Sequence, residues 1–130
     1  MKKLFTLGML LLLSAPMSVS ADEGLLYELR TYTTHEGKLD NLHSRFRDHT
    51  MVLFEKHGIK NVGYWIPSDK PNTLIYLIAH KSADAAKASW GGFVSDPQWQ
   101  EVYKNSRADG PIVTNIENVF MSATDYSLVK

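Results

Sequence analysis

The sequence contains no cysteine among its 130 residues. This absence excludes a disulfide scaffold, a zinc finger, an iron–sulfur cluster, a thiol nucleophile and a lipid-anchored cysteine. An excess of charge of either sign is also lacking, because 14 Lys and Arg residues balance 14 Asp and Glu residues. Without a basic surface or a glycine-rich phosphate loop, we expect no nucleic-acid partner.

Apolar residues are plentiful by contrast. Hydrophobic residues make up 44% of the chain and aromatic residues 11%, a composition typical of a folded protein rather than a disordered one. The length suits one ordinary domain, and no linker, internal repeat or low-complexity tract divides the chain.

The first 21 residues have the pattern of a secretory signal peptide. Lys2 and Lys3 precede a short apolar run, and Val19 and Ala21 stand where a signal peptidase requires small residues. The apolar run is about half of the roughly 20 residues that span a bilayer, which makes an uncleaved anchor the weaker alternative. We therefore expect residues 1–21 to be removed and residues 22–130 to form an exported domain that is free of the membrane. In a cell with two membranes its compartment is the periplasm.

Hydrophobic periodicity predicts the secondary structure of the mature chain. Residues 25–33 alternate and are rich in aromatic and β-branched side chains, which indicates a strand. Residues 38–57 carry apolar side chains at spacings of three and four, which predicts a helix ending at Gly58 with His49 on its buried stripe. Residues 61–66 and 73–80 predict two strands of a hairpin, because the segment between them is rich in turn residues.

Two further helices and a last strand complete the order. Ser82 is expected to cap a helix that runs to about Trp90. Asp96 and Pro97 form an N-cap and first turn that open a short helix, and residues 112–121 predict the last strand.

This order of elements is that of an α+β, ferredoxin-like βαββααβ sandwich, in which helices cover one face of a four-stranded antiparallel sheet. The strand 73–80 is apolar on both faces, so the uncovered face is expected to be apolar as well. One copy of the domain cannot shield that face. We therefore expect a homodimer in which two sheets pack face to face and close a barrel.

A series of short motifs then resembles the NIPSNAP family. The motifs occur in order along nearly the whole mature chain: Tyr27-Glu28-Leu29-Arg30-Thr31-Tyr32, Lys56-His57-Gly58, Val62-Gly63-Tyr64-Trp65, Asp96-Pro97-Gln98-Trp99 and Thr124-Asp125-Tyr126-Ser127. The resemblance implies a dimeric α+β barrel, the architecture of antibiotic-biosynthesis monooxygenases and haem-degrading monooxygenases. It implies no particular reaction. Where members of the family often have a proline within the first helix, this chain has Thr50-Met51-Val52.

The strongest candidate site lies on the first strand. Alternation places Tyr27, Leu29 and Thr31 on one face, and we expect that face to meet the helices because it is the more apolar. The other face carries Glu28, Arg30 and Tyr32 and is expected to line the barrel interior. Arg30 could bind a carboxylate or an enolate oxygen, Tyr32 could donate a hydrogen bond, and Glu28 could act as a base if burial raises its pKa. The alternative is a structural Glu28–Arg30 ion pair.

Three further candidate ligand-binding residues are Tyr64, Tyr76 and His80. Tyr76 and His80 share one face of the strand 73–80, and Tyr64 and Trp65 point in opposite directions, so that one of these two can line the interior. The histidine spacings match no metal-binding pattern, and we expect no metal site. Haem held by a single histidine is the one cofactor that stays open.

Three functions are compatible with these patterns. The first is a binding domain that holds a small apolar or aromatic ligand in its interior. The second is a cofactor-independent monooxygenase or isomerase, in which Glu28 or His80 removes a proton and Arg30 with Tyr32 stabilises the resulting enolate. The third is a purely structural dimer with a filled interior. A cavity of about 300 Å³ or more with Glu28 and Arg30 unpaired on its wall would favour the first two functions. A solidly packed interior or a closed Glu28–Arg30 pair would favour the third.

Overall fold

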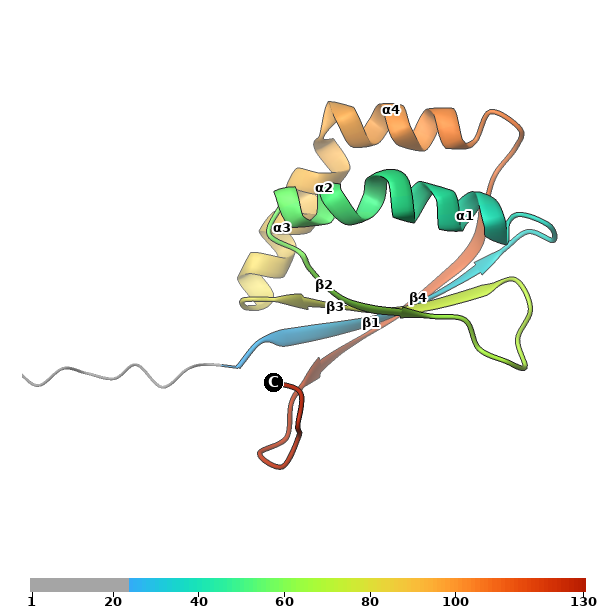
Figure 1. Ribbon diagram of the computed structural model, residues 1–130. Helices are drawn as coiled ribbons and strands as arrows, with labels where there is room; N and C mark the ends of the chain where they lie inside the picture. Colours follow the sequence, from blue (N-terminus) through green and yellow to red (C-terminus); the bar gives the residue numbers. More distant parts are fainter. Residues whose placement is uncertain (1–23) are drawn as a thin grey trace, which may run out of the picture.

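The computed structural model describes residues 24–130, which form one sheet with helices on one side, α4 lying outside α1 and α2 (Figure 1). The predicted signal peptide, residues 1–21, lies outside the described residues. The elements follow in the predicted order and are β1 (Leu26–Thr34), α1 (Leu39–Arg45), η1 (Phe46–Thr50), α2 (Met51–Lys56), β2 (Lys60–Trp65), β3 (Thr73–His80), α3 (Ala83–Ser95), α4 (Pro97–Ser106) and β4 (Val113–Ser122).

The four strands form one antiparallel sheet in the order β2-β3-β1-β4, which is the ferredoxin-like arrangement. The helices all lie on one side of this sheet, as Figure 1 shows. In the register of the two central strands, Arg30 lies opposite Tyr76 and Glu28 lies opposite Ile78. On the other side of β1, Asn118 of the edge strand β4 lies opposite Arg30. The predicted α+β sandwich is confirmed.

The predicted first helix contains a π-helical turn, η1, between α1 and α2. The hydroxyl of Thr50 donates a 3.2 Å hydrogen bond to the carbonyl oxygen of Arg45, five residues earlier, and so fills the widened turn. One extra residue in the turn rotates the helix that follows. As a result Thr50 is buried, and His49, predicted to lie on the buried stripe, is exposed. The prediction for His49 is wrong for this reason, since periodicity assumes an unbroken α-helix.

The helix α3 is longer than the sequence indicated. Ser82 caps it as predicted, accepting a 3.0 Å hydrogen bond from the amide of Ala85. The helix continues through Gly91 and Gly92 to Ser95, however. A Cβ atom at Gly92 would lie 3.0 Å from Nδ1 of His57, so glycine allows α3 to approach the end of α2 closely. The predicted end at about Trp90 is therefore wrong.

The helix α4 begins as predicted. The Oδ1 oxygen of Asp96 accepts a 2.8 Å hydrogen bond from the amide of Gln98, and Pro97 occupies the first turn. The other carboxylate oxygen, Oδ2, lies 2.7 Å from both Lys56 Nζ and His57 Nε2. Asp96 thus joins the start of α4 to the end of α2, and these contacts lower the pKa of its carboxyl group.

The core lies between the helices and the sheet and is strongly aromatic. Phe46 and Phe54 pack against Tyr76 of the central strand β3, with ring centroids 5.0 and 6.3 Å away. Tyr64 of β2 stacks on the same ring at 5.1 Å. The helical layer is therefore anchored on Tyr76, and the residues around this ring are held in fixed positions.

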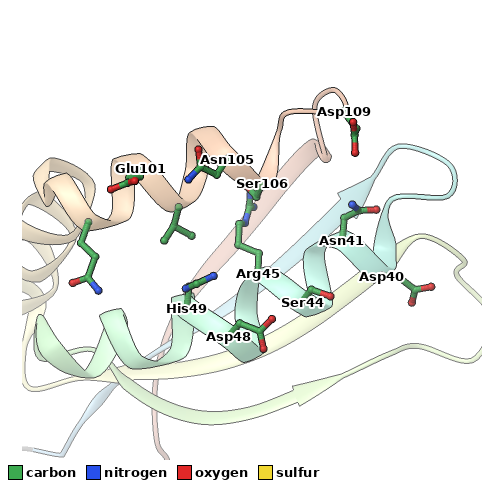
Figure 2. A pocket seen from close by; sticks show the side chains of 12 residues that line it. Asp40, Asn41, Ser44, Arg45, Asp48, His49, Glu101, Asn105, Ser106 and Asp109 are labelled. Carbon is green, nitrogen blue, oxygen red and sulfur yellow. The ribbon is translucent and has the colours of Figure 1, made fainter.

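A polar cleft of about 620 Å³ separates α4 from α1 and η1 on the outer side of the helices. Figure 2 shows Arg45 extending across this cleft from the end of α1 towards Ser106 of α4. Four carboxylates line the cleft: those of Asp40, Asp48, Glu101 and Asp109.

The face of the sheet that points away from the helices carries apolar residues on all four strands, together with Glu117 of β4. The register places Leu29, Leu77 and Val119 side by side on this face, and Trp65 of β2 lies across Gly63 on the same face. Val119 is 55% exposed and Trp65 is 54% exposed. Within residues 24–130, no helix is both long and apolar enough to cross a bilayer.

Candidate functional site

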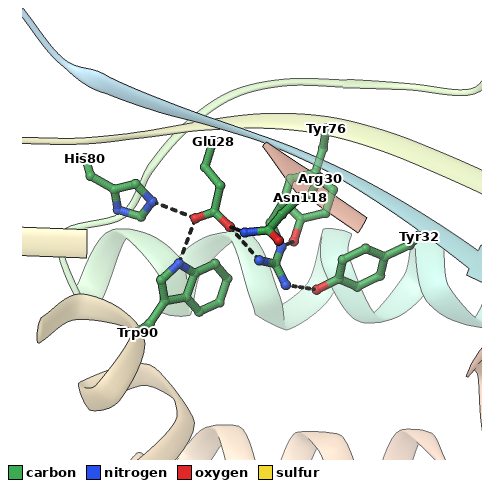
Figure 3. A network of polar contacts seen from close by, with 7 residues as sticks. All are labelled: Glu28, Arg30, Tyr32, Tyr76, His80, Trp90 and Asn118. Carbon is green, nitrogen blue, oxygen red and sulfur yellow. Dashed lines mark hydrogen bonds and ion pairs between the residues drawn. The ribbon is translucent and has the colours of Figure 1, made fainter. Parts of the chain in front are cut away.

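Glu28, Arg30 and Tyr32 lie between the sheet and the helices, as Figure 3 shows. The clearest evidence is the indole of Trp90, a residue of α3, which donates a 2.8 Å hydrogen bond to Oε1 of Glu28. The prediction that these three residues line the uncovered face is therefore wrong. The physical reason is that the helical layer itself supplies polar partners, so the polar face of β1 can be buried without unsatisfied groups.

The carboxylate of Glu28 accepts four hydrogen bonds. On Oε1 the donors are Trp90 Nε1, at 2.8 Å, and His80 Nε2, at 3.0 Å. On Oε2 they are Arg30 Nη1, at 2.5 Å, and Asn118 Nδ2, at 3.2 Å. Because a carboxylate only accepts, His80 carries its proton on Nε2. The donors come from four different places in the chain and fill the acceptor capacity of this group.

These contacts keep Glu28 ionised. Burial alone would raise the pKa of its carboxyl group, but the hydrogen bonds from His80, Trp90 and Arg30 outweigh that effect and lower the pKa to about 2. A carboxylate that is saturated with donors and has so low a pKa is a poor proton acceptor. Glu28 is therefore not suited to the role of general base that the sequence left open for it.

The guanidinium of Arg30 is held by three groups. Nη1 is bonded to Glu28, Nε donates a 2.9 Å hydrogen bond to the hydroxyl of Tyr76, and Nη2 donates one of 3.2 Å to the hydroxyl of Tyr32. The group also lies 4.5 Å from the centre of the Trp90 ring. Burial would lower the pKa of Arg30, yet these partners together raise it, so the group is a fixed cation.

The other predicted site residues divide into two groups. Tyr76 and His80 lie on the same face as Glu28 and join its network, directly or through Arg30. Tyr64 also points to the helix side, where its hydroxyl donates a 2.5 Å hydrogen bond to Oδ1 of Asn61, but it stays outside this network. Trp65 points the opposite way, as the alternation indicated.

Burial raises the pKa of both Tyr64 and Tyr76, so both are neutral phenols. At Tyr76 the neighbouring Tyr32 adds to the effect of burial, whereas the charge of Arg30 opposes it. The hydroxyl of Tyr76 therefore serves Arg30 as an uncharged acceptor.

Two cavities lie beside this network, both between the edge strand β4 and the helices. One, of about 430 Å³, is lined by Tyr32, by Ile116 of β4 and by residues of η1, α3 and α4. The other, of about 460 Å³, is lined by Trp90 of α3 and by Phe120 of β4. Asn118 stands between Ile116 and Phe120 on the same face of β4 and thus separates the two cavities. Both volumes fall within the range of small-molecule sites.

Sequence reasoning did not identify Trp90, Asn118 and Arg45 as parts of this region. Asn118 shares its face of the last strand with Ile116 and Phe120, and a lone amide between apolar residues is a signal that could have been used. Trp90 could not be placed, because the predicted helix ended there. Arg45, which lines the 430 Å³ cavity, is buried at the start of the π-helical turn.

The site gives little support to a metal or haem. Among residues 24–130, no group of three or more His, Cys, Asp or Glu side chains is arranged to hold a metal ion. Within the same described part of the chain, neither cavity beside β4 has a histidine in its wall, so neither offers the single histidine ligand expected for haem.

Comparisons with known proteins agree with the fold. A NIPSNAP family protein of unknown function from Agrobacterium tumefaciens is 22% identical, with a TM-score of 0.73 over 85% of this chain and 97% of that chain. A NIPSNAP-like domain protein from Burkholderia xenovorans is 15% identical, with a TM-score of 0.71 over 81% and 90%. SnoaB, a cofactor-independent oxygenase from Streptomyces nogalater, is 20% identical, with a TM-score of 0.59 over 85% and 100%.

At these identities the likeness to solved structures shows the fold alone. No protein of curated function matches the chain. The profile of the NIPSNAP family, however, matches residues 27–128, which is most of the sequence and includes all four strands. The chain belongs to the NIPSNAP family.

Proposed function

We propose that this NIPSNAP domain binds a small apolar or aromatic molecule between β4 and the helices. The observation that carries the proposal is the 430 Å³ cavity, whose wall contains Phe46, Phe93, Trp99 and Ile116 beside the hydroxyl of Tyr32. A cavity of this size with mostly apolar walls and few polar groups has the character of a ligand site. The apolar walls would supply affinity and the polar groups orientation.

The closed network beside the cavity supports binding rather than proton transfer. Glu28 and Arg30 are paired with each other and satisfied by their neighbours. The hydrogen bonds around Glu28 and Arg30 hold this part of the cavity wall rigid, which lowers the entropy that a ligand must overcome on binding. The closed Glu28–Arg30 pair also suits a structural dimer, and the feature that favours binding is the cavity on the helix side of the sheet.

We propose further that the domain acts as a homodimer through its uncovered sheet face. Within residues 24–130, the chain itself overlays one end of that face, where Ser127 and Val129 of the C-terminal segment lie near Tyr27 and Leu77. The rest, including Val119 and Trp65, stays open. A second copy presents the same apolar surface, so a two-fold symmetric contact would bury the apolar face of each copy against that of the other.

Native mass spectrometry of the protein taken from its own compartment tests the binding proposal. We expect a dimer that carries the mass of a small organic molecule, which is released when the protein unfolds. The variant Ile116→Trp, which fills the cavity, should lose this mass. The matched control Val52→Trp, on the outer side of α2, should keep it. A wild-type dimer without added mass would contradict the proposal.

A cofactor-independent oxygenase or isomerase is the second candidate function. One observation favours it: Glu28 holds His80 by Nε2, and the other nitrogen, Nδ1, is buried with no hydrogen-bond partner among the described residues. A histidine oriented by a carboxylate in this way is a suitable general base. In this reaction His80 would remove a proton from an acidic C–H group, and Arg30 with Tyr32 would stabilise the enolate. His80 is buried and lines neither cavity beside β4, so a local rearrangement would be needed to bring the substrate to it.

The recovered molecule separates the two functions. Incubated with the protein in air, it should stay unchanged if the domain only binds it. The catalytic function would be established instead if the wild-type protein converts the molecule and the variant His80→Gln binds the molecule but no longer converts it.

The predicted signal peptide supports a further proposal, that the domain acts outside the cytoplasm. The mass of the protein recovered from the periplasm or the medium should then correspond to a chain that begins at Asp22. A protein of full length confined to the cytoplasm would contradict export.

A further inference from the structure

Arg45 is a buried cation at the end of α1, with a residue exposure of 5%. Its Nη1 donates a 3.2 Å hydrogen bond to the hydroxyl of Ser106. Its guanidinium carbon lies 5.5 Å from the ring centre of Trp99 and 5.4 Å from that of Tyr103. Its Nε is buried and, within residues 24–130, has no hydrogen-bond partner. The group is thus enclosed by aromatic rings and incompletely bonded.

The charge of Arg45 is not neutralised by the residues that the structure describes. The ion pairs found among them are those of Arg30 with Glu28, of His80 with Glu28, and of Lys56 and His57 with Asp96. A like charge lies close by, since Arg107 lies over the same Tyr103 ring at 4.7 Å. Burial lowers the pKa of Arg45, which reflects this unfavourable setting. A buried charge without a partner is costly, so it calls for an explanation.

The two cavities on either side of Arg45 differ in charge. The outer cleft of Figure 2 is lined by the four carboxylates named above, which would repel an anion. The 430 Å³ cavity contains Arg45 as the single charged residue in the part of its wall that the structure describes. An anion would therefore be favoured in the inner cavity and disfavoured in the outer cleft.

We propose that the molecule held in the 430 Å³ cavity carries a carboxylate, which Arg45 binds, on an aromatic or aliphatic body. The inference rests on the proposed ligand-binding function and adds the charge of the ligand to it. The planar guanidinium offers N–H groups with the spacing of a carboxylate's two oxygens, and Nε–H is free to donate. Trp99, Phe93 and Ile116 would contact the apolar body.

Isothermal titration calorimetry with 2-naphthoate and 2-naphthamide tests this proposal, because the two probes share one ring system and differ in charge. The wild-type protein should bind the carboxylate about tenfold to a hundredfold more tightly than the amide, as expected for a hydrogen bond between charged groups. The variant Arg45→Met should reduce the affinity for the carboxylate to that for the amide. The control Arg47→Met, two residues away on the exposed side of η1, should change neither affinity.

The outcomes separate the two proposals. Equal affinities of the wild-type protein for both probes would overturn the assignment of a carboxylate and leave ligand binding intact. If neither probe binds and the protein carries no molecule of its own, both proposals are overturned. The affinities of the wild-type protein for the two probes can be compared without any variant. This comparison therefore tests the carboxylate assignment even if Arg45→Met does not fold. Arg45→Lys, which keeps the charge and loses the planar fork, should bind the carboxylate with intermediate affinity.

Discussion

The indole nitrogen of Trp90 and the Oε1 oxygen of Glu28, 62 positions apart in the sequence, are joined by a hydrogen bond of 2.8 Å. This bond links α3 to the central strand β1 and decides which face of the sheet is covered. The polar residues of β1 are buried under helices, and the apolar residues of β1 lie on the open face. The candidate ligand site and the candidate dimer contact are consequently on opposite faces of the sheet.

Replacing Trp90 by phenylalanine should destabilise the protein by about 1–3 kcal/mol, because Glu28 loses one donor while it stays buried. The free energy of unfolding, measured with a chemical denaturant, checks this value. Trp99→Phe is the matched control, since it shortens another partly buried indole that makes no hydrogen bond among residues 24–130. If Trp90→Phe lowers the free energy of unfolding no more than the control does, the hydrogen bond to Glu28 contributes nothing to stability.

Glu28 should make the free energy of unfolding decrease as the pH falls. Its pKa is about 2 in the folded protein against 4.5 as the reference value, so the unfolded chain takes up a proton first as the pH falls. The stabilisation is present above about pH 4.5 and is lost towards pH 2. It amounts to about 3 kcal/mol for a shift of this size.

The variant Glu28→Gln tests this dependence. Its free energy of unfolding should fall less steeply than that of the wild type between pH 5 and pH 2, by about 3 kcal/mol in total. Glu36→Gln, which changes an exposed carboxylate of the β1–α1 turn, should keep the wild-type slope. Parallel curves for wild type and Glu28→Gln would contradict the network described around this residue.

Val119→Glu should convert the proposed homodimer to a monomer, because it places a charge on an apolar part of the sheet face that the dimer would bury. Size-exclusion chromatography with light scattering measures the change in mass. Val52→Glu is a matched control, since Val52 is 68% exposed on α2, away from the sheet. If both variants stay dimeric, or the wild type is a monomer in dilute solution, the sheet-to-sheet dimer is wrong.

The sequence was sufficient to predict the fold because its signals are local. The strand 73–80, the cap at Ser82 and the start of α4 at Asp96 are each specified by adjacent residues, and the structure confirms them. The covered face of β1 was not predictable in this way. Alternation separates Glu28 from Leu29, but the partners that let Glu28 be buried, such as Asn118, are distant in sequence.

The π-helical turn is the second feature that local patterns missed. It shifts Thr50 into the core in place of His49 and leaves Arg45 buried against Trp99. Periodicity counts 3.6 residues for every turn, so one extra residue changes which side chains face inwards.

Fluorine NMR of protein labelled with 5-fluorotryptophan tests most directly where the ligand binds. The chain has three tryptophans: Trp99 lines the 430 Å³ cavity, Trp90 lines the second cavity beside the network, and Trp65 lies on the open sheet face. On addition of 2-naphthoate, we predict that the resonance of Trp99 moves and that of Trp65 does not. A shift of Trp65 with an unchanged Trp99 would place the ligand against the open sheet face and contradict the account.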